Sequence, residues 1–241
     1  MVVEIGSEIR IKNASKELNA WAQENLIIPN PQYRERERRG LWVGNTPKYL
    51  WLYHVDGSDL IVPTGVGKQV RQFLSEKDKI SVHLADNGIL DYKGTIPLYD
   101  YQKDAVEAMQ RTSCGILQSP CGSGKTQMGI ALAAELSRKV LWITHTQDLL
   151  TQSKTRAEQY FPEETLGTIT AGKAQVGSHI TFATVQTLCK MDLDQFRYTW
   201  DVVIVDECHR LAGSPTQVTM FYKVMNGLAA RHKYGLSATV H

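Results

Sequence analysis

Hydrophobic and polar positions change their pattern at about residue 91, and the longer part that follows predicts an α/β fold. There, short apolar runs alternate with stretches that repeat apolar residues at helical spacing. The apolar runs predict strands over residues 115–118, 140–144, 180–184, 202–205 and 235–237, and the helical stretches predict helices over 126–138, 147–160 and about 216–226. Because continuously apolar strands are buried on both faces, this alternation predicts a parallel sheet flanked by helices, with right-handed connections.

The preceding residues have a different pattern, which predicts a smaller α+β domain. Apolar and aromatic residues run from Tyr49 to Val55, Asp56-Gly57 is a turn signal, and a second apolar run covers 60–63, so we expect a β-hairpin. A short amphipathic stretch at 70–74 predicts a helix after it. We therefore divide the chain into an accessory domain, 1–94, and an α/β domain, 95–241.

The composition of the chain is that of a soluble globular protein. Hydrophobic residues make up 42% of the 241 residues and charged residues 22%, which argues against a mainly disordered chain. No apolar run approaches the roughly 18 residues that span a bilayer, and Glu4 and Glu8 stand where a secretory signal would be basic and then apolar. We expect a cytoplasmic protein with no membrane partner.

The charge of the chain argues against nucleic-acid binding through bulk charge, and its cysteines argue against a structure held together by disulfides or zinc. The net charge of +2 is too small to indicate nucleic-acid binding through bulk charge, so any such surface must be local. The four cysteines contain no C-x-x-C pair, which argues against a disulfide scaffold or a zinc ribbon. We expect reduced thiols.

A phosphate-binding loop is the strongest local signal. Residues 119–126, SPCGSGKT, follow a predicted strand and open a predicted helix. Backbone N–H groups around Cys121, Gly122, Ser123 and Gly124 can close around phosphate oxygens, with the positive end of the helix dipole behind them. Lys125 would reach the β and γ phosphates and Thr126 would bind Mg²⁺, so the residues call for ATP and Mg²⁺. Ser119 stands where the general pattern has glycine, and a chance match in a linker is the alternative.

A pair of carboxylates at the end of another predicted strand supplies the second signal. Asp206 and Glu207 follow the apolar run 202–205, and ligands of parallel sheets bind at the carboxyl ends of strands. Asp206 can therefore reach the Mg²⁺ shell, while Glu207 can orient and deprotonate an attacking water. A solvated turn or helix cap is the alternative for an isolated Asp-Glu pair. A metal site at Cys208 and His209 lacks the usual additional ligands.

The accessory domain contains three ambiguous features. Residues 64–68, TGVGK, resemble a phosphate loop, but Gln69 follows the lysine in place of a hydroxyl residue, so we interpret them as a loop after the hairpin. The arginines at 34, 36, 38 and 39 are interleaved with two glutamates and favour a solvated loop over a phosphate contact. Aromatic residues at 42, 49, 51 and 53 can stack on bases, although in a hairpin we expect them in the core.

Together these motifs resemble the first motor domain of a superfamily 2 helicase, with residues 206–209, DECH, as its DExH box. The resemblance covers about 98–241 and implies a RecA-like fold. Residues 98–102, LYDYQ, are similar to the adenine-reading element of the XPB-like and restriction-type branch, which implies that Gln102 contacts adenine, while Tyr99 and Asp100 depart from that element.

The same resemblance implies roles in coupling ATP hydrolysis to nucleic acid. His209 would connect the γ phosphate to the partner motor domain and to the GLSAT string, 235–239. The implied nucleic-acid coupling residues are Thr146, Gln152, Thr184, Gln186, Ser237 and Thr239.

We therefore expect the N-terminal half of an ATP-dependent DNA helicase or translocase acting on duplex or branched DNA, with the accessory domain, 1–94, binding or orienting that DNA. A second RecA-like domain, with arginine fingers, would lie in the same longer chain, and without it we expect weak or no hydrolysis. Three alternatives stay open: a nucleotide-gated binding module without motor activity, the motor subunit of a restriction system, and an RNA helicase.

Overall fold

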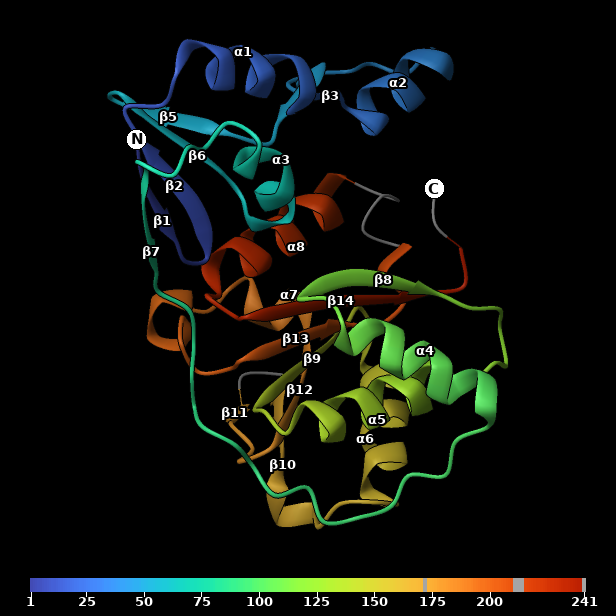
Figure 1. The fold of residues 1–241 in the computed structure, drawn as a ribbon. Helices are drawn as coiled ribbons and strands as arrows, with labels where there is room; N and C mark the ends of the chain where they lie inside the picture. Colours follow the sequence, from blue (N-terminus) through green and yellow to red (C-terminus); the bar gives the residue numbers. More distant parts are fainter. Residues whose placement is uncertain (171–172, 210–214, 240–241) are drawn as a thin grey trace. The chain divides into compact units, whose positions relative to one another are not determined.

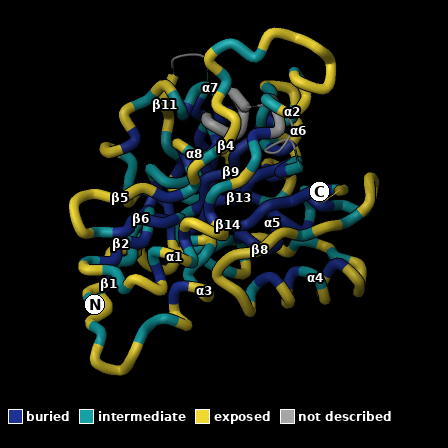
Figure 2. The backbone as a smooth tube through the Cα atoms, turned by 90° about the horizontal axis from the view of Figure 1, so that it is seen from above, coloured by how far each residue is buried: buried dark blue, intermediate teal, exposed yellow. Residues whose placement is uncertain are grey.

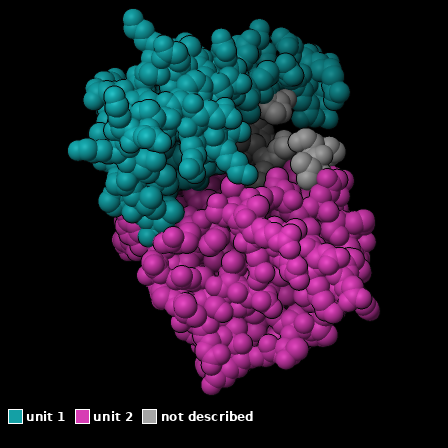
Figure 3. Space-filling view, viewed as in Figure 1, with its two compact units in different colours: residues 1–84, 212–219 teal, residues 85–211, 220–241 magenta. Residues whose placement is uncertain are grey.

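The computed structural model describes residues 1–170, 173–209 and 215–239, which form two compact units (Figures 1 and 3). Unit 1 consists of Met1–Leu84 with Ala212–Thr219, and unit 2 of Ala85–Leu211 with Met220–His241. The division lies ten residues before the predicted boundary at 94/95. Among the described residues, no helix is long and apolar enough to cross a membrane.

Unit 2 is built on a seven-stranded sheet, and all of its ladders except the one at one edge are parallel. The strands, in their order across the sheet, are β11 (Lys173–Gln175), β10 (Leu166–Thr170), β12 (Ile180–Thr184), β9 (Val140–Thr144), β13 (Val202–Val205), β14 (His232–Ser237) and β8 (Cys114–Gln118). Only β11 pairs antiparallel. The predicted parallel sheet is confirmed, and Figure 2 shows its central strands buried.

Helices cover both faces of this sheet, as predicted. They are α4 (Asp100–Gln110), α5 (Lys125–Leu136), α6 (Gln147–Glu158), the short α7 (Val185–Leu188) and α8 (Pro215–Gly227). Trp142 packs with α4, α5 and α6 in one apolar cluster, whereas its neighbour Ile143 packs with α7 and with Phe221 of α8 in another. Successive residues of β9 thus bury their side chains on opposite faces, which explains its unbroken apolar sequence.

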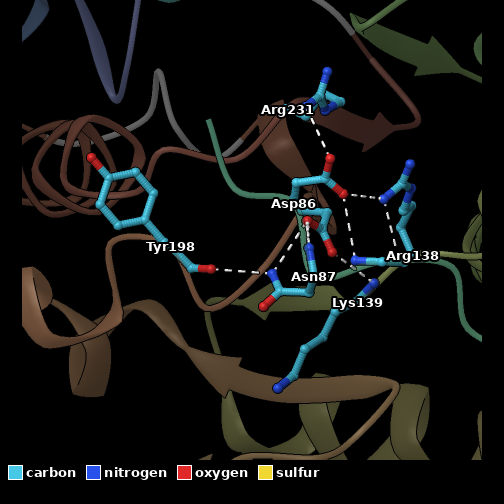
Figure 4. Close-up of polar contacts among 8 residues, drawn as sticks. Asp86, Asn87, Arg138, Lys139, Tyr198 and Arg231 are labelled. Atoms are coloured by element: carbon cyan, nitrogen blue, oxygen red, sulfur yellow. Dashed lines mark hydrogen bonds and ion pairs between the residues drawn. The ribbon is translucent and has the colours of Figure 1, made fainter. Parts of the chain in front are cut away.

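A strap with no helix or strand, residues 85–99, is fastened to unit 2. Its Leu90 N–H donates to the carbonyl of Ser137 at 2.9 Å, and the Tyr92 hydroxyl donates to that of Arg138 at 2.8 Å. Asp201, 1% exposed, accepts from the backbone N–H groups of Asn87 and Lys139 at 2.9 and 3.2 Å (Figure 4). These bonds explain why unit 2 begins at residue 85.

Unit 1 is an α+β module, as predicted. Its five strands, in their order across the sheet, are β5 (His54–Asp56), β6 (Asp59–Pro63), β2 (Glu8–Lys12), β1 (Val2–Ile5) and β7 (Lys79–Val82). Helix α1 (Lys16–Asn25) buries Leu18 and Ala22 against Ile11 and Leu60 of this sheet. The Ser15 hydroxyl caps the helix by accepting from the Leu18 N–H at 3.2 Å.

The predicted hairpin is present but shorter than expected. Strands β5 and β6 pair around the Asp56-Gly57 turn, whereas β4 (Tyr49–Trp51) pairs with β3 (Ile27–Pro29) in a separate two-stranded sheet. Residues 64–66 form a 3-10 turn and α3 (Gly67–Arg71) follows, so the expected loop there and the helix expected at 70–74 are both wrong in detail. Gly67 has φ −58°, which is helical backbone and not the left-handed backbone of a phosphate loop.

Two other expectations for unit 1 are wrong. The arginines expected in a loop lie on α2 (Pro31–Arg38) and just after it, where Glu35 and Arg39 form an ion pair one helical turn apart, at 2.7 Å. Among the aromatic residues expected in the core, only Tyr53 is buried. Trp42, Tyr49 and Trp51 are 85%, 47% and 62% exposed.

Candidate nucleotide-binding site

The loop between β8 and α5 has the backbone geometry of an anion cradle. Gly122 and Gly124 have φ of +79° and +82°, in the left-handed region that glycine adopts without strain. Helix α5 begins at Lys125, and its first N–H groups have no acceptor within the helix. A helix start of this kind binds phosphate through those N–H groups and the positive end of the helix dipole.

Side chains within the loop fix its shape. The Ser119 hydroxyl donates to the Ser123 hydroxyl at 2.7 Å, so the residue that departs from the general pattern ties the two ends of the loop together. Lys125, 8% exposed, donates from its ammonium to the carbonyls of Ser119 and Pro120, each at 3.3 Å. Lysine is therefore positioned inside the loop, where it would meet phosphate oxygens.

Residues of α4 hold this loop from outside. The Ser123 carbonyl accepts from the Tyr101 hydroxyl at 3.0 Å and from the Gln102 amide at 2.9 Å, and the Gln102 oxygen accepts from the Tyr99 N–H at 3.0 Å. A Cβ at Gly124 would lie 2.4 Å from the Gln102 nitrogen, so this contact requires glycine there. Gln102 thus bridges α4 and the phosphate loop, and its contact with adenine stays a prediction.

Asp206 lies at the same edge of the sheet as the phosphate loop. Strand β14 pairs with both β13 and β8, placing Gly235 opposite Val205 and Ser237 opposite Gln118. Asp206 is 4% exposed, and its carboxylate accepts from the Ser153 hydroxyl at 3.3 Å.

The electrostatics of Asp206 connect it with the loop. Burial raises the pKa of Asp206 and Glu207 adds to the rise, while the positive charge of Lys125 lowers it. Hydrogen bonds from the Glu207 N–H and the Ser153 hydroxyl lower the pKa of Asp206 more than Lys125 does. Carboxylate and hydroxyl oxygens are hard ligands of the kind that Mg²⁺ prefers, so Asp206 and Thr126, the second residue of α5, stay the predicted Mg²⁺ ligands.

Glu207, His209 and Ser237 form a network that extends from the acidic pair to the loop. His209 Nδ1 lies 3.1 Å from Glu207 Oε2 and 3.1 Å from the Ser237 hydroxyl. The Ser237 hydroxyl also contacts the backbone of Thr239, and the Ser237 carbonyl accepts from the Ser119 N–H at 2.9 Å. Glu207, at the start of this network, has a backbone φ of +51°, which is uncommon for residues other than glycine.

The remaining predicted coupling residues follow β9 and β12, whose carboxyl ends lie at the same edge. Thr146 caps α6 by accepting from the Leu149 N–H at 3.3 Å. The Gln186 amide donates to the carbonyl of His145 at 2.7 Å and so links the two loops, and the Thr184 hydroxyl contacts that of Thr187 at 2.9 Å. Gln152 is exposed on α6. Their nucleic-acid roles stay predictions.

Cys208 faces the core and not the site. Its thiol would lie 2.7 Å from a Cβ at Gly235, and burial raises its pKa to about 11. Cys121 by contrast is exposed on the phosphate loop.

Three contacts of the site were not predicted from the sequence: Ser119 with Ser123, Tyr101 with Ser123, and Ser153 with Asp206. Only Tyr101, next to the predicted Gln102, had a signal in the sequence.

Comparison with known proteins finds a family model that matches much of the chain and relatives that are named as DNA helicases or translocases. Residues 95–241 match the family model described as Type III restriction enzyme, res subunit. The DNA 3'-5' translocase XPB2 of Sulfurisphaera tokodaii is 28% identical over 181 residues, 71% of this chain and 38% of that protein. The DNA 3'-5' helicase XPB of Mycobacterium tuberculosis is 25% identical over 152 residues, 59% of this chain and 26% of that protein. The chain thus spans well under half the length of these relatives.

Solved structures show the same fold. The UvsW helicase from bacteriophage T4 has a TM-score of 0.67 at 21% identity, covering 99% of this chain and 93% of that one. The SWI2/SNF2 ATPase core of Sulfolobus solfataricus, solved with double-stranded DNA, has a TM-score of 0.52 at 17% identity, covering 64% and 34%. With its RecA-like sheet and a family model matched over more than half its length, the chain belongs to the family of the Type III restriction enzyme res subunit, a superfamily 2 motor family.

Proposed function

We propose that this chain is the N-terminal half of an ATP-dependent DNA helicase or translocase that couples hydrolysis of Mg-ATP to unwinding or remodelling of duplex or branched DNA. One observation carries the proposal: β14 pairs with both β8 and β13, so the phosphate loop with the buried Lys125 and the buried Asp206 lie at the same edge of one sheet. An ammonium and a carboxylate placed together beside an anion cradle match the needs of a metal-bound triphosphate.

Each residue of the site has a distinct role in this proposal. The loop N–H groups and Lys125 bind the β and γ phosphates, and Thr126 and Asp206 would hold a Mg²⁺ ion that would neutralise phosphate charge. Glu207 orients the attacking water and accepts its proton at the carboxylate. His209 contacts one oxygen of that carboxylate, 3.1 Å away, and so fixes its direction.

The network from Glu207 through His209 to Ser237 supports a motor and not a passive switch. A protein that only senses bound nucleotide needs no general base. A motor must hydrolyse ATP and transmit the state of the γ phosphate to the nucleic acid on which it moves. The coupling residues Thr146, Gln152, Thr184, Gln186 and Thr239 are proposed as the DNA-facing part of this network.

DNA as the partner is supported by the names of the relatives. A second RecA-like domain of a longer chain would add the arginine fingers, which contribute about 10³- to 10⁵-fold in related reactions.

The test is DNA-stimulated ATP hydrolysis by the complete protein. Because we expect a cytoplasmic protein, the assay uses the pH and salt concentration of the cytoplasm. We expect stimulation by duplex or branched DNA, little by RNA, and loss of turnover with Lys125→Ala. Glu207→Gln should retain ATP binding while abolishing turnover, because it removes the base and leaves the phosphate contacts. Unchanged turnover in Glu207→Gln would reject the catalytic assignment of Glu207. Binding of ATP without DNA-stimulated turnover in the unchanged protein would favour a nucleotide-gated binding module.

A further inference from the structure

Unit 1 exposes three large aromatic rings within ten residues of sequence. Trp42, Tyr49 and Trp51 are 85%, 47% and 62% exposed, although the unit has an apolar core of its own. Single exposed apolar residues are normal on protein surfaces, but rings gathered in one segment mark an interaction site. Residues 31–51, from α2 through β4, are called the aromatic–arginine segment below.

The rings of this segment are held in place and not merely loose on the surface. Trp42 packs over the αL residue Gly44, where a Cβ would lie 3.0 Å from its ring. Tyr49 and Trp51 are two residues apart on β4 and so share one face of the β3–β4 sheet. Trp51 also leans on Tyr53, with ring centroids 5.7 Å apart. Ordered rings lose little conformational entropy when a partner stacks on them.

A buried amide fixes the entrance to this strand. Asn30, 1% exposed, donates from its side chain to the Pro47 carbonyl at 2.8 Å and from its backbone to the Lys48 carbonyl at 2.9 Å. Asn30 lies between β3 and α2, so these bonds join the start of the helix to the residues just before β4. Arg36 of α2 donates to the carbonyl of Trp42 at 3.3 Å and connects the helix with the first ring.

The segment is also the basic part of the chain. It contains five basic and two acidic residues, a net charge of +3, whereas the whole chain carries +2. Glu35 is paired with Arg39. Arg34 and Arg38 are exposed and one helical turn apart, so they share one face of α2. The Lys48 ammonium lies 6.0 Å from the Tyr49 ring centroid.

We propose that the aromatic–arginine segment binds unpaired nucleotides, with bases stacked on Trp42, Tyr49 and Trp51 and phosphates met by Arg34, Arg38 and Lys48. Exposed rings with interleaved cations are the recognition chemistry of single strands. Base faces are hidden inside a duplex, so this chemistry selects unpaired over paired nucleotides. The site goes beyond the proposed motor function and operates without ATP.

The experiment measures how the complete protein, in the absence of ATP, binds a fluorescent oligo-dT and a matched duplex. Binding is followed by fluorescence anisotropy and by quenching of tryptophan fluorescence. Single-strand binding should exceed duplex binding. Trp42→Ala and Trp51→Ala should each weaken it about tenfold, and Trp42→Phe should restore most of the loss. Val55→Ala, also exposed in unit 1, is the matched control and should change nothing.

Two further readouts make the outcome decisive. Arg34→Ala with Arg38→Ala should reduce the slope of log affinity against log salt by about 0.7 per lost phosphate contact. The ATPase rate without DNA should be unchanged in all these variants, which separates this site from the motor, since loss of the motor would appear in Lys125→Ala instead. Unchanged single-strand affinity in the Trp42→Ala, Trp51→Ala double variant, with normal folding by circular dichroism, would overturn the proposal and leave a protein partner as the occupant.

Discussion

At the scale of single residues, Tyr101 connects the region before the phosphate loop to the loop itself. Its hydroxyl donates to the Ser123 carbonyl at 3.0 Å. Tyr101→Phe keeps the ring but removes this bond, which contributes about 0.5–1.5 kcal/mol, so we expect ATP to bind two- to tenfold more weakly. Titration with ATP and Mg²⁺ measures this. Tyr99→Phe, whose ring stacks on Tyr101 at 5.9 Å, is the control, and an equal effect of both changes would contradict the role of the Tyr101 hydroxyl.

Asp206 is a residue at which the site lowers the stability of the fold. Burial and then Glu207 raise the pKa of Asp206 above the ordinary value of 3.8. The folded state therefore binds the proton of this carboxyl more tightly than the unfolded chain does, and the free energy of unfolding falls as pH rises through the folded pKa. Asp206→Asn stays neutral and can still contact Ser153. We expect it to raise the melting temperature at pH 7, by less as pH approaches 3.8, and to abolish ATP turnover. The exposed Asp104→Asn should not change the pH dependence. A lower melting temperature at pH 7 would refute this account.

At the scale of elements, strands were predictable where both faces are buried and less so elsewhere. β9, β12 and β13 are mostly apolar and were predicted to the residue, whereas β10, LGTIT, was missed because only two of its five residues, a leucine and an isoleucine, are strongly apolar. The phosphate loop and the acidic pair were local in sequence and therefore predictable. The contact of His209 with Ser237 depends on β13 and β14 being neighbours, and no local pattern determines strand order.

The same strand pair contains a close approach that mutation can test. Gly235 of β14 lies against Cys208, whose Sγ would be 2.7 Å from a new Cβ. Gly235→Ala should overpack this contact and lower the unfolding free energy by about 1–3 kcal/mol. Cys208→Ala removes the sulfur, so the double variant should recover much of that loss in urea unfolding. Additive effects of the two changes would show that the cost of alanine at 235 has another source.

At the scale of the whole molecule, the two units differ in what they expose. Unit 2 buries both faces of its central strands and places the buried Lys125 and Asp206 at one edge of its sheet, whereas unit 1 leaves three large aromatic rings and several arginines exposed. The sequence could not predict this difference, because an aromatic residue at a strand position fits a core and a binding surface equally well. Only the pairing of β4 with β3, outside the larger sheet, leaves Tyr49 and Trp51 exposed.

The strap tests how the chain is divided. Residues 85–99 have no helix or strand and would pass for a linker, yet Leu90 and Tyr92 are hydrogen-bonded to unit 2, and Ile96 and Leu98 pack against its core. Proteases cleave segments that can open locally, and opening here would break these bonds and expose apolar surface. We therefore expect limited trypsin digestion to cleave first at Arg38, Arg39 or Lys48 and to spare Lys93, as mass spectrometry of the fragments would show. Asp201→Ala, which leaves the N–H groups of Asn87 and Lys139 without their acceptor, should make Lys93 cleavable. Early cleavage at Lys93 in the unchanged protein would mean that the strap is a linker after all and that unit 2 begins nearer to residue 95.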